Sequence, residues 1–458
     1  MRQTEKKYQS LPFWSWNDEL DEQALCDQIQ WMYDNGIGGF FMHARGGLKT
    51  EYLGEKWFRC IKACAKKAKE LGMEAYAYDE NGWPSGFVGG KLLEDIENHD
   101  RYLTFTVGDY DSSALVSYDL SGEALVRTVG GKNCLNVFQH YSVSTVDILN
   151  PEVVEQFIAL THQQYKACDE GILKGFFTDE PQYYRWDTPY TKMLVPYFQE
   201  EYGEDILDGL GLLFVEKEGY RAFRYKYWKA MQSLMLRNFS EKIYVWCDEN
   251  GYKLTGHYVD ENSLSGQMWC CGGIMPFYEY EHIPGIDWLG RDLGTALAPR
   301  QVSSVAAQLG KRQILTETYG CCGWDVTPQE LKRIAEFQYV GGVNLMCQHL
   351  LPYSEYGQRK RDYPAHYSPV NPWVRANFKQ FNDYFSYLGK VLAESDEAVN
   401  VAVFHPIRSA YFGYKRYAAP ESKYGILELE QSLSSLTTGL TERQIGFHYL
   451  DETLLAKY

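Results

Sequence analysis

The sequence lacks the cysteine spacings of zinc ribbons and of thiol redox motifs. Its 11 cysteines include no Cys-x-x-Cys pair, and their number is odd. Scattered, unpaired thiols are typical of a reducing compartment, because structural disulfides form in oxidising ones. We therefore expect a cytoplasmic protein with neither a zinc ribbon nor a thioredoxin-type motif.

Long apolar runs and basic clusters are missing as well. No stretch is long and apolar enough to span a bilayer, and the polar N-terminus contains no apolar signal-peptide core. The formal net charge is −16, and no run rich in Lys or Arg stands out. Because nucleic-acid binding needs a basic patch, we expect neither a nucleic-acid partner nor a membrane association. Assembly into a homo-oligomer is left open.

Aromatic residues, in contrast, are abundant: the chain has 37 Tyr, 22 Phe and 12 Trp. Aromatic rings stack on the apolar faces of sugars, and Tyr and Trp add a polar tip to a flat face. A large core also needs many big side chains, and composition alone favours that simpler explanation. The position of the aromatic residues therefore has to decide between a core and a sugar site.

The chain repeats one order of elements: a short apolar run, a polar or Gly-rich loop, and an amphipathic helix. Eight such runs are found, at residues 11–17, 37–43, 73–78, 173–177, 253–258, 285–288, 313–316 and 342–347. Eight β/α units predict an α/β fold of the (β/α)8 TIM-barrel type within residues 1–395. An open doubly wound sheet would show a Gly-rich phosphate turn after its first strand, and none is present.

Several other segments have a clear pattern. Helices are predicted at 21–34, 53–71, 151–169 and 329–339, with a long helical region at 190–250 and a further helix ending near 392. Short alternating segments between Gly and Asp turns predict a small β insertion at about 101–147, after the third strand. Residues 396–458 form a C-terminal α/β segment in which 398–404 reads as a buried strand. This segment either begins a truncated second domain or packs on the barrel.

Functional groups of a TIM barrel lie at the C-terminal ends of its strands. Glu180 follows the fourth apolar run, and Glu317 follows the seventh. These strands lie on opposite sides of the barrel mouth, so their carboxyl groups can face each other across a sugar. Cleavage of a glycosidic bond needs such a pair, one as the acid and one as a nucleophile or base. We therefore predict that Glu180 and Glu317 are catalytic rather than ordinary loop carboxylates.

Other polar and aromatic residues at the same strand ends are candidates for binding substrate. They are Trp14, Asn17, His43, Arg45, Asp79, Glu80, Trp83, Asp179, His257, Tyr258, Tyr319, Trp324 and His349. The tryptophans would stack on the sugar, and most of the polar groups would bind its hydroxyls. The histidines could instead ligate a metal or only support the fold, and Asp79 and Glu80 could orient Arg45 or bind calcium. No clear set of metal ligands emerges, so we expect neither a cofactor nor a metal.

Six motifs resemble bacterial glycosyl hydrolases related to the α-L-rhamnosidase family 106, within the clan-A-like barrel glycosidases. They are FWSWNDEL (13–20), GIGGFFMHAR (36–45), YDENGWPSG (78–86), TDEP (178–181), LTETYG (315–320) and HYSPVNPW (366–373). The resemblance implies a carbohydrate substrate, Glu180 as the general acid/base and Glu317 as the nucleophile. It also implies that related proteins carry further domains after the barrel.

Two departures from this resemblance affect the predicted mechanism. Asp179 stands where clan-A enzymes commonly place Asn, and the calcium ligands of the rhamnosidases cannot be matched onto this chain. We expect a hydrolase that removes a terminal sugar from an oligosaccharide or glycoconjugate with retention. An inverting, rhamnosidase-like hydrolase and a non-catalytic carbohydrate-binding barrel are the alternatives. A barrel aldolase is less favoured, because no Lys directly follows a strand end.

Overall fold

Two parallel β-sheets form the centre of the molecule. The computed structural model describes residues 6–356, 367 and 369–458, so His366 and Ser368 of the last motif lie outside the described residues. One sheet has the strand order β10-β8-β3-β2-β1-β14 and the other β11-β12-β13. The strands are β1 (Phe13–Trp16), β2 (Gly39–Ala44), β3 (Glu74–Asn81), β8 (Gly175–Asp179), β10 (Lys253–His257), β11 (Gly285–Trp288), β12 (Leu315–Thr318), β13 (Leu345–Gln348) and β14 (Leu351–Pro352).

All eight predicted strands are confirmed, with boundaries shifted by a few residues. The two sheets approach each other at both ends. A parallel bridge joins Thr255, on β10, to Ile283 just before β11. At the other end, the Leu11 amide before β1 donates a hydrogen bond of 2.8 Å to the Met346 carbonyl on β13.

A separate apolar core lies where the inner faces of the two sheets meet. Its members come from both sheets and the segments beside them: Leu11, Phe13, Phe41, Tyr76, Tyr78, Phe177, Ile283, Leu315, Leu345, Cys347 and Leu350. The Phe177 ring lies 4.7 Å from that of Phe13 and 4.8 Å from that of Phe41, both edge-on. Successive side chains of a strand point to opposite faces, so the neighbours of these residues pack outward against helices.

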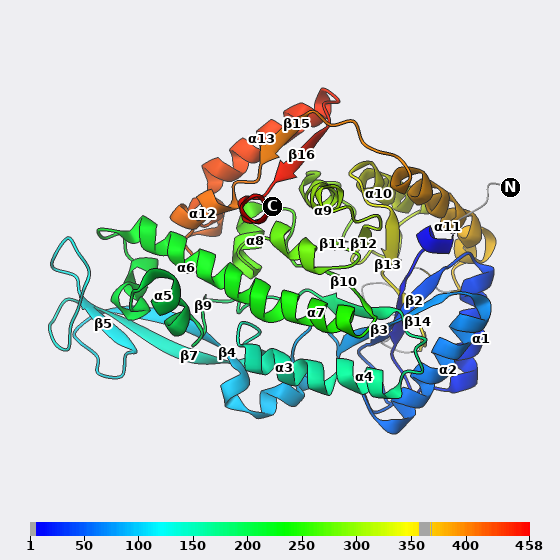
Figure 1. Ribbon diagram of the computed structural model, residues 1–458, viewed down its shortest axis with the longest axis horizontal. Helices are drawn as coiled ribbons and strands as arrows, with labels where there is room; N and C mark the ends of the chain where they lie inside the picture. Colours follow the sequence, from blue (N-terminus) through cyan, green and yellow to red (C-terminus); the bar gives the residue numbers. More distant parts are fainter. Residues whose placement is uncertain (1–5, 357–366, 368) are drawn as a thin grey trace.

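Helices follow most of the parallel strands and cover their outer faces (Figure 1). They are α1 (Glu22–Asp34), α2 (Glu55–Leu71), α3 (Pro151–Leu160), α4 (His162–Cys168), α5 (Leu194–Tyr202), α6 (Tyr220–Met235), α7 (Lys242–Glu249), α8 (Leu264–Cys270), α9 (Leu297–Gln308), α10 (Pro328–Val340) and α11 (Pro372–Ala393). Local signals fix their ends: the Asp21 side chain caps α1, and Thr327 and Glu330 form a capping box on α10. In the described part of the chain, no helix has both the length and the apolarity to cross a membrane.

Two predicted helical regions are divided in the structure. The region 151–169 breaks at Thr161 into α3 and α4. The region 190–250 begins at the last residue of the short strand β9 (Thr188–Tyr190). It then contains α5, two short 3-10 turns and finally a continuous helix. That helix runs from α6 through a π-helical turn (Leu236–Glu241) into α7. Each short helix buries its own apolar face. The periodicity of apolar residues alone does not distinguish several short helices from one long helix.

An antiparallel sheet projects from one side of the molecule, at the left of Figure 1. Its strand order is β6-β5-β7-β4-β9. The strands are β4 (His99–Gly108), β5 (Val116–Asp119), β6 (Val126–Arg127), β7 (Cys134–Val146) and β9 (Thr188–Tyr190). The first four come from the segment predicted as a β insertion. The fifth comes from the chain after β8, so this sheet holds the loop that leaves the end of β8.

The C-terminal residues form a two-stranded parallel sheet and three helices. They are β15 (Val401–Phe404), α12 (Ile407–Gly413), α13 (Leu427–Glu442), β16 (Phe447–Leu450) and α14 (Glu452–Lys457). Arg300 of α9 connects to them: it forms a 2.7 Å ion pair with Glu397 and donates a 3.0 Å hydrogen bond to the Phe447 carbonyl. The expectation that 398–404 is a buried strand is wrong in one respect. The strand forms, but Val403 is its only buried residue, and Phe404 is 63% exposed at the surface of a narrow sheet.

Candidate active site

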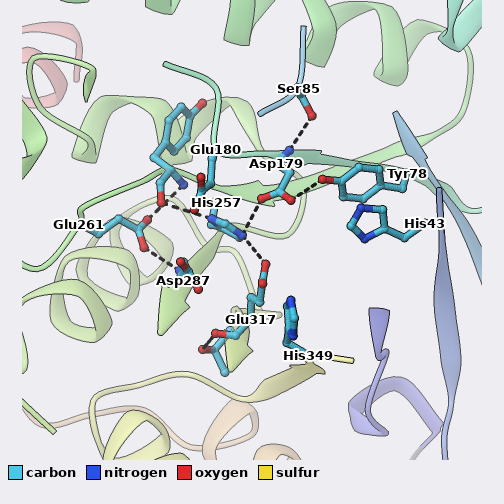
Figure 2. A network of polar contacts seen from close by, with 12 residues as sticks. His43, Tyr78, Ser85, Asp179, Glu180, His257, Glu261, Asp287, Glu317 and His349 are labelled. Carbon is cyan, nitrogen blue, oxygen red and sulfur yellow. Dashed lines mark hydrogen bonds and ion pairs between the residues drawn. The ribbon is translucent and has the colours of Figure 1, made fainter. Parts of the chain in front are cut away.

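Each of eight parallel strands ends in an inward-pointing polar side chain, and we call these residues the polar layer. They are Ser15 (β1), His43 (β2), Tyr78 (β3), Asp179 (β8), His257 (β10), Asp287 (β11), Glu317 (β12) and His349, directly after β13. Strand alternation places them there, because most lie two residues beyond a member of the inner apolar core. The strand register sets Asp179 beside His257 and Asp287 beside Glu317. Figure 2 shows the centre of this layer.

His257 lies between two carboxylates at the centre of the polar layer (Figure 2). Its Nε2 atom is 2.6 Å from Oε2 of Glu317 and 3.1 Å from Oδ1 of Asp179. Its Nδ1 atom is 3.3 Å from the Tyr258 carbonyl, so both ring nitrogens have acceptors. Burial lowers the pKa of His257, but Glu317 and Asp179 outweigh it and hold that pKa well above the usual value. The side chain is therefore an imidazolium that joins the two carboxylates.

Asp179 is held on all sides. The Tyr78 hydroxyl donates to its Oδ2 atom, and His257 pairs with its Oδ1 atom. Its backbone amide donates to Oγ of Ser85 at 2.8 Å, and its carbonyl accepts from the Ser85 amide, also at 2.8 Å. The Ser85 hydroxyl in turn donates to Oδ1 of Asp79 at 2.6 Å. The end of β8 is thus fastened to the loop after β3.

Glu180 follows directly and has an unusual backbone. Its φ is +45°, in the left-handed region that a residue with a Cβ adopts at an energetic cost. No described residue hydrogen-bonds or ion-pairs with its carboxyl group. Burial, followed by the charge of Asp179, raises the pKa of Glu180 to about 8. At neutral pH this group is a carboxylic acid with a proton to donate.

Glu317 has the opposite electrostatic surroundings. Burial raises its pKa above the ordinary glutamate value, but the charge and the hydrogen bond of His257 oppose that rise. Glu317 therefore loses its proton more readily than Glu180, which has no cation in contact. The carboxyl groups of Glu180 and Glu317 thus have different electrostatic surroundings, and such a difference is what separates the pKa values of an acid/base pair.

Two further carboxyl groups lie on the other side of His257 (Figure 2). Burial, followed by the charge of Glu317, raises the pKa of Asp287 well above the usual value. Glu261, in the loop after β10, accepts hydrogen bonds from the Asp287 amide at 2.7 Å and from the Tyr278 hydroxyl at 3.1 Å. Burial raises the pKa of Glu261 to about 7. Glu261 orients the backbone of β11, and Asp287 adds a carboxyl group with a raised pKa to the polar layer.

The opposite side of the layer carries aromatic and basic groups. The His43 ring stacks on Tyr78 with centroids 3.6 Å apart, and burial followed by Arg45 holds its pKa well below the usual value. Arg45 reaches Nε2 of His43 at 3.5 Å and Nε2 of His349 at 3.2 Å. Its guanidinium also lies 4.2 Å from the centroid of the Trp83 ring, and that ring is 39% exposed. Two imidazoles, a cation and an accessible indole suit the binding of sugar hydroxyls and of an apolar sugar face.

Asp79 and Glu80 were expected to bind substrate, but the structure places them behind the site. Asp79 lies one residue beyond the inward-facing Tyr78, so it points outward, where Thr178 donates to it at 2.6 Å and His162 lies 3.6 Å away. Burial raises the pKa of Asp79 to about 8. The Glu80 carboxylate accepts hydrogen bonds from five backbone amides, those of residues 81 and 86–89. Both residues shape the loop that carries Trp83 and Ser85.

Three other expected substrate ligands are turned away or enclosed. Trp14 is fully buried on the outer face of β1, where its Nε1 atom donates to Gln28 of α1, so no face of its ring is open to a sugar. The Asn17 side chain pairs with the backbone of Ser354 in both directions. Tyr258 hydrogen-bonds to Ser240 and packs on Phe277.

The remaining two lie in the loop after β12. Tyr319 is fully buried, and its ring faces Tyr367 and Phe381 on the outer side. Its φ of +86° interrupts the strand alternation that would have turned it inward. Trp324 lies further along this loop and is 57% exposed.

Sequence reasoning did not select Tyr78, Ser85, Asp287 or Glu261 as site residues. Alternation from Tyr76 could have found Tyr78, because both point into the same core. Asp287 lies within the sixth apolar run, next to its last residue, so it is a polar strand-end residue like those that were selected. Glu261 and Ser85 act through loop geometry, for which the sequence gives no comparable signal.

Asp179, His257 and Glu317 each offer one ligand atom, and these three atoms lie within 4.8 Å of one another, as metal ligands would. Calcium, which the family resemblance implies, takes six to eight oxygen ligands. Two carboxylates and one imidazole nitrogen do not provide that set, and the nitrogen already holds its proton between the carboxylates. These three residues do not fit calcium.

The chain matches no protein-family model and no curated protein. Among solved structures it is similar to the rhamnosidase from Novosphingobium sp. PP1Y, with a TM-score of 0.69 at 12% identity over 98% of this chain and 63% of that one. It is also similar to Gan42B, a GH42 β-galactosidase, with a TM-score of 0.57 at 10% identity over 97% of this chain and 66% of that one. The chain thus spans less than two thirds of either protein. It has the fold of these glycoside hydrolases, an α/β fold with parallel sheets.

The first prediction concerns the charge of His257. We expect both ring nitrogens of His257 to remain protonated well above pH 6.5, because Glu317 and Asp179 stabilise the cation. Nitrogen chemical shifts of labelled histidine, followed during a pH titration, measure this directly. Glu317→Gln should lower the pKa of His257, whereas replacing the distant, exposed Glu200 by Gln should leave it unchanged. A neutral His257 at pH 7 in the wild-type protein would contradict the assignment.

Proposed function

We propose that this protein is a glycoside hydrolase that cleaves an O-glycosidic bond with Glu180 as general acid/base and Glu317 as nucleophile. The observation that carries the proposal is the contrast between the two carboxyl groups. Glu317 is paired with the His257 cation, whereas the carboxyl group of Glu180 has no hydrogen-bond partner among the described residues and a pKa of about 8. The fold shared with known glycoside hydrolases agrees with this activity but does not by itself establish it.

The proposal includes a closed (β/α)8 barrel. The bridge between Thr255 and Ile283 and the hydrogen bond between Leu11 and Met346 connect the two sheets at both ends. The inner apolar core contains residues from both sheets, as the filled interior of a barrel does. The polar layer above that core then forms the floor of the barrel mouth.

In the first step, the Glu180 carboxyl donates its proton to the glycosidic oxygen as the bond to the anomeric carbon breaks. The same group, now a carboxylate, later removes a proton from the water that enters. The left-handed backbone of Glu180 directs its carboxyl away from the line of β8, while Ser85 fixes the preceding residue. The hydrogen bonds to Asp179 fix the residue before Glu180, and the Gln182 side chain donates to the Glu180 carbonyl at 3.2 Å.

Glu317 attacks the anomeric carbon and forms the glycosyl-enzyme ester, which water then hydrolyses. His257 holds the Oε2 atom of Glu317, so one carboxylate oxygen is fixed and the other is available for attack. As the negative charge of Glu317 is consumed, the imidazolium keeps its second partner, Asp179. His257 is therefore able to orient the nucleophile throughout the cycle without losing its own charge stabilisation.

The sugar is placed between Glu317 and the side of the layer formed by His43, Arg45 and His349, with Trp83 stacking on its apolar face. We propose removal of a terminal sugar, with rhamnose as the first to test. The six motifs and the similarity to the rhamnosidase support this choice and the relationship to family 106. Calcium takes no part in the proposed steps. A bacterial, cytoplasmic protein remains an expectation from the sequence.

Glutamine substitutions test the two roles. Glu180→Gln should lower kcat/KM for a substrate with a poor leaving group by about 10²–10⁴-fold, because the acid is lost, and should have less effect on a 2,4-dinitrophenyl glycoside. Glu317→Gln should nearly abolish turnover of both substrates. The assay is hydrolysis of nitrophenyl glycosides of rhamnose, galactose, glucose, glucuronate, fucose and arabinose.

Glu200→Gln, on the exposed side of α5, is the matched control and should behave as the wild type. Circular dichroism checks that each variant is folded. Near-wild-type activity of either active-site variant would remove that residue from the mechanism. Sugar binding without hydrolysis across the whole panel would instead identify a non-catalytic carbohydrate-binding barrel.

The pH dependence follows from the state of Glu180. The acid must be protonated in the free enzyme, so kcat/KM should fall as the pH rises through about 8. It should also fall on the acidic side as Glu317 becomes protonated, at a pH above the ordinary glutamate range. Profiles measured with a poor leaving group test both limbs, and a dinitrophenyl leaving group should weaken the alkaline limb. A rate that keeps rising beyond pH 9 would be incompatible with Glu180 as the acid.

The configuration of the first product tests retention. If Glu317 attacks carbon, the released sugar initially has the anomeric configuration of the substrate. A proton NMR time course, recorded before mutarotation, distinguishes the two anomers. Inversion would show that Glu317 activates water instead.

A further inference from the structure

We propose that Arg185 and Trp186 form a binding site for a carboxylate-bearing sugar, such as a uronate, on the leaving-group side of the scissile bond. This inference rests on the proposed hydrolase function and specifies the substrate. It starts from the loop that connects Glu180, at the end of β8, to β9 of the antiparallel sheet. Neither residue takes part in the mechanism described above.

The backbone of this loop is fixed on both sides of the two residues. The buried Arg416 side chain donates to the Tyr184 carbonyl at 3.1 Å and to the Asp187 carbonyl at 2.9 Å. The Tyr184 ring stacks on Tyr102 of β4, with centroids 4.6 Å apart and planes 16° apart. Arg185 and Trp186 therefore form the tip of a short loop whose two ends are anchored, which is a preorganised position for binding.

The tip itself presents a cation on an aromatic surface. The Arg185 guanidinium lies 4.9 Å from the centroid of the Trp186 ring, and Trp186 is 65% exposed. No described residue forms an ion pair with Arg185, although the chain has a net charge of −16. A stacked guanidinium leaves its N–H edge open, and that edge matches both oxygens of a carboxylate.

The position of Arg185 and Trp186 indicates on which side of the scissile bond they bind. Arg185 is five residues after the general acid, and its charge acts on the Glu180 carboxyl. The other arginine near the site, Arg45, acts instead on Glu317. Because the acid protonates the leaving oxygen, the group bound next to Glu180 is the one that leaves. An exposed indole beside the cation supplies a stacking surface for its ring.

A binding measurement that needs no turnover tests this site. Ligand-observed NMR titrations compare methyl β-D-glucuronide with methyl β-D-glucoside, which differ only in the carboxylate. We expect the wild-type protein to bind the glucuronide about tenfold more tightly or better at low ionic strength. Arg185→Ala should reduce the difference to about twofold or less, and Arg185→Lys should give an intermediate value, because a charge without the planar fork remains. Higher salt should weaken the preference of the wild type.

Arg221→Ala is the matched control. Arg221 likewise lies beside an aromatic residue, Tyr220, but it is exposed on α6, outside the polar layer. This variant should keep the full preference for the glucuronide. Equal binding of the two sugars by the wild type, an undiminished preference in Arg185→Ala, or an equal loss in Arg221→Ala would overturn the proposal.

The outcome is independent of the hydrolase assay. If no aryl glycoside is hydrolysed but the Arg185-dependent preference is found, the anion site stands as a binding site and the catalytic proposal fails. If aryl glycosides are hydrolysed but no preference is found, the hydrolase stands and the anion site fails.

Discussion

The active-site arrangement depends on one buried cation. Asp179 and Glu317 are almost fully enclosed, and two carboxylates at this depth would be strongly destabilised without a counter-charge. His257 supplies that charge through a single nitrogen shared between them. The same interaction separates the behaviour of Glu317 from that of Glu180, because only Glu317 contacts the cation. Removing His257 would therefore alter both the stability of the strand ends and the assignment of acid and nucleophile.

The alternation of side chains along the strands explains why this chemistry lies where it does. A strand of a parallel barrel-like sheet points every second residue to the interior, so the apolar core and the polar layer are successive levels of the same rows. Phe177 is followed by Asp179, and Leu315 by Glu317. The polar groups thus rest on a packed floor that excludes water from below and strengthens their electrostatic interactions.

The sequence predicts the strands well and puts Glu180 and Glu317 at strand ends, but it does not show which way every neighbouring side chain faces. In parallel sheets both faces are buried, so large apolar residues stand on both faces of a strand such as β1 and do not mark the inner one. Trp14 and Asp79 therefore looked equivalent to His43 and Asp179, and only the packing places the former two outside. Tyr319 is a different case, because its positive φ cannot be read from an ordinary tyrosine.

Two parts of the chain that lie outside the parallel sheets meet at the loop after Glu180. The antiparallel sheet contributes Tyr102 and includes β9, the strand into which the loop continues. The C-terminal segment contributes Arg416, whose guanidinium binds the two carbonyls on either side of the loop tip. Neither part supplies a group to the polar layer. Their shared effect is to hold the chain that follows Glu180, and such an anchored loop is what the proposed selection of a leaving group requires.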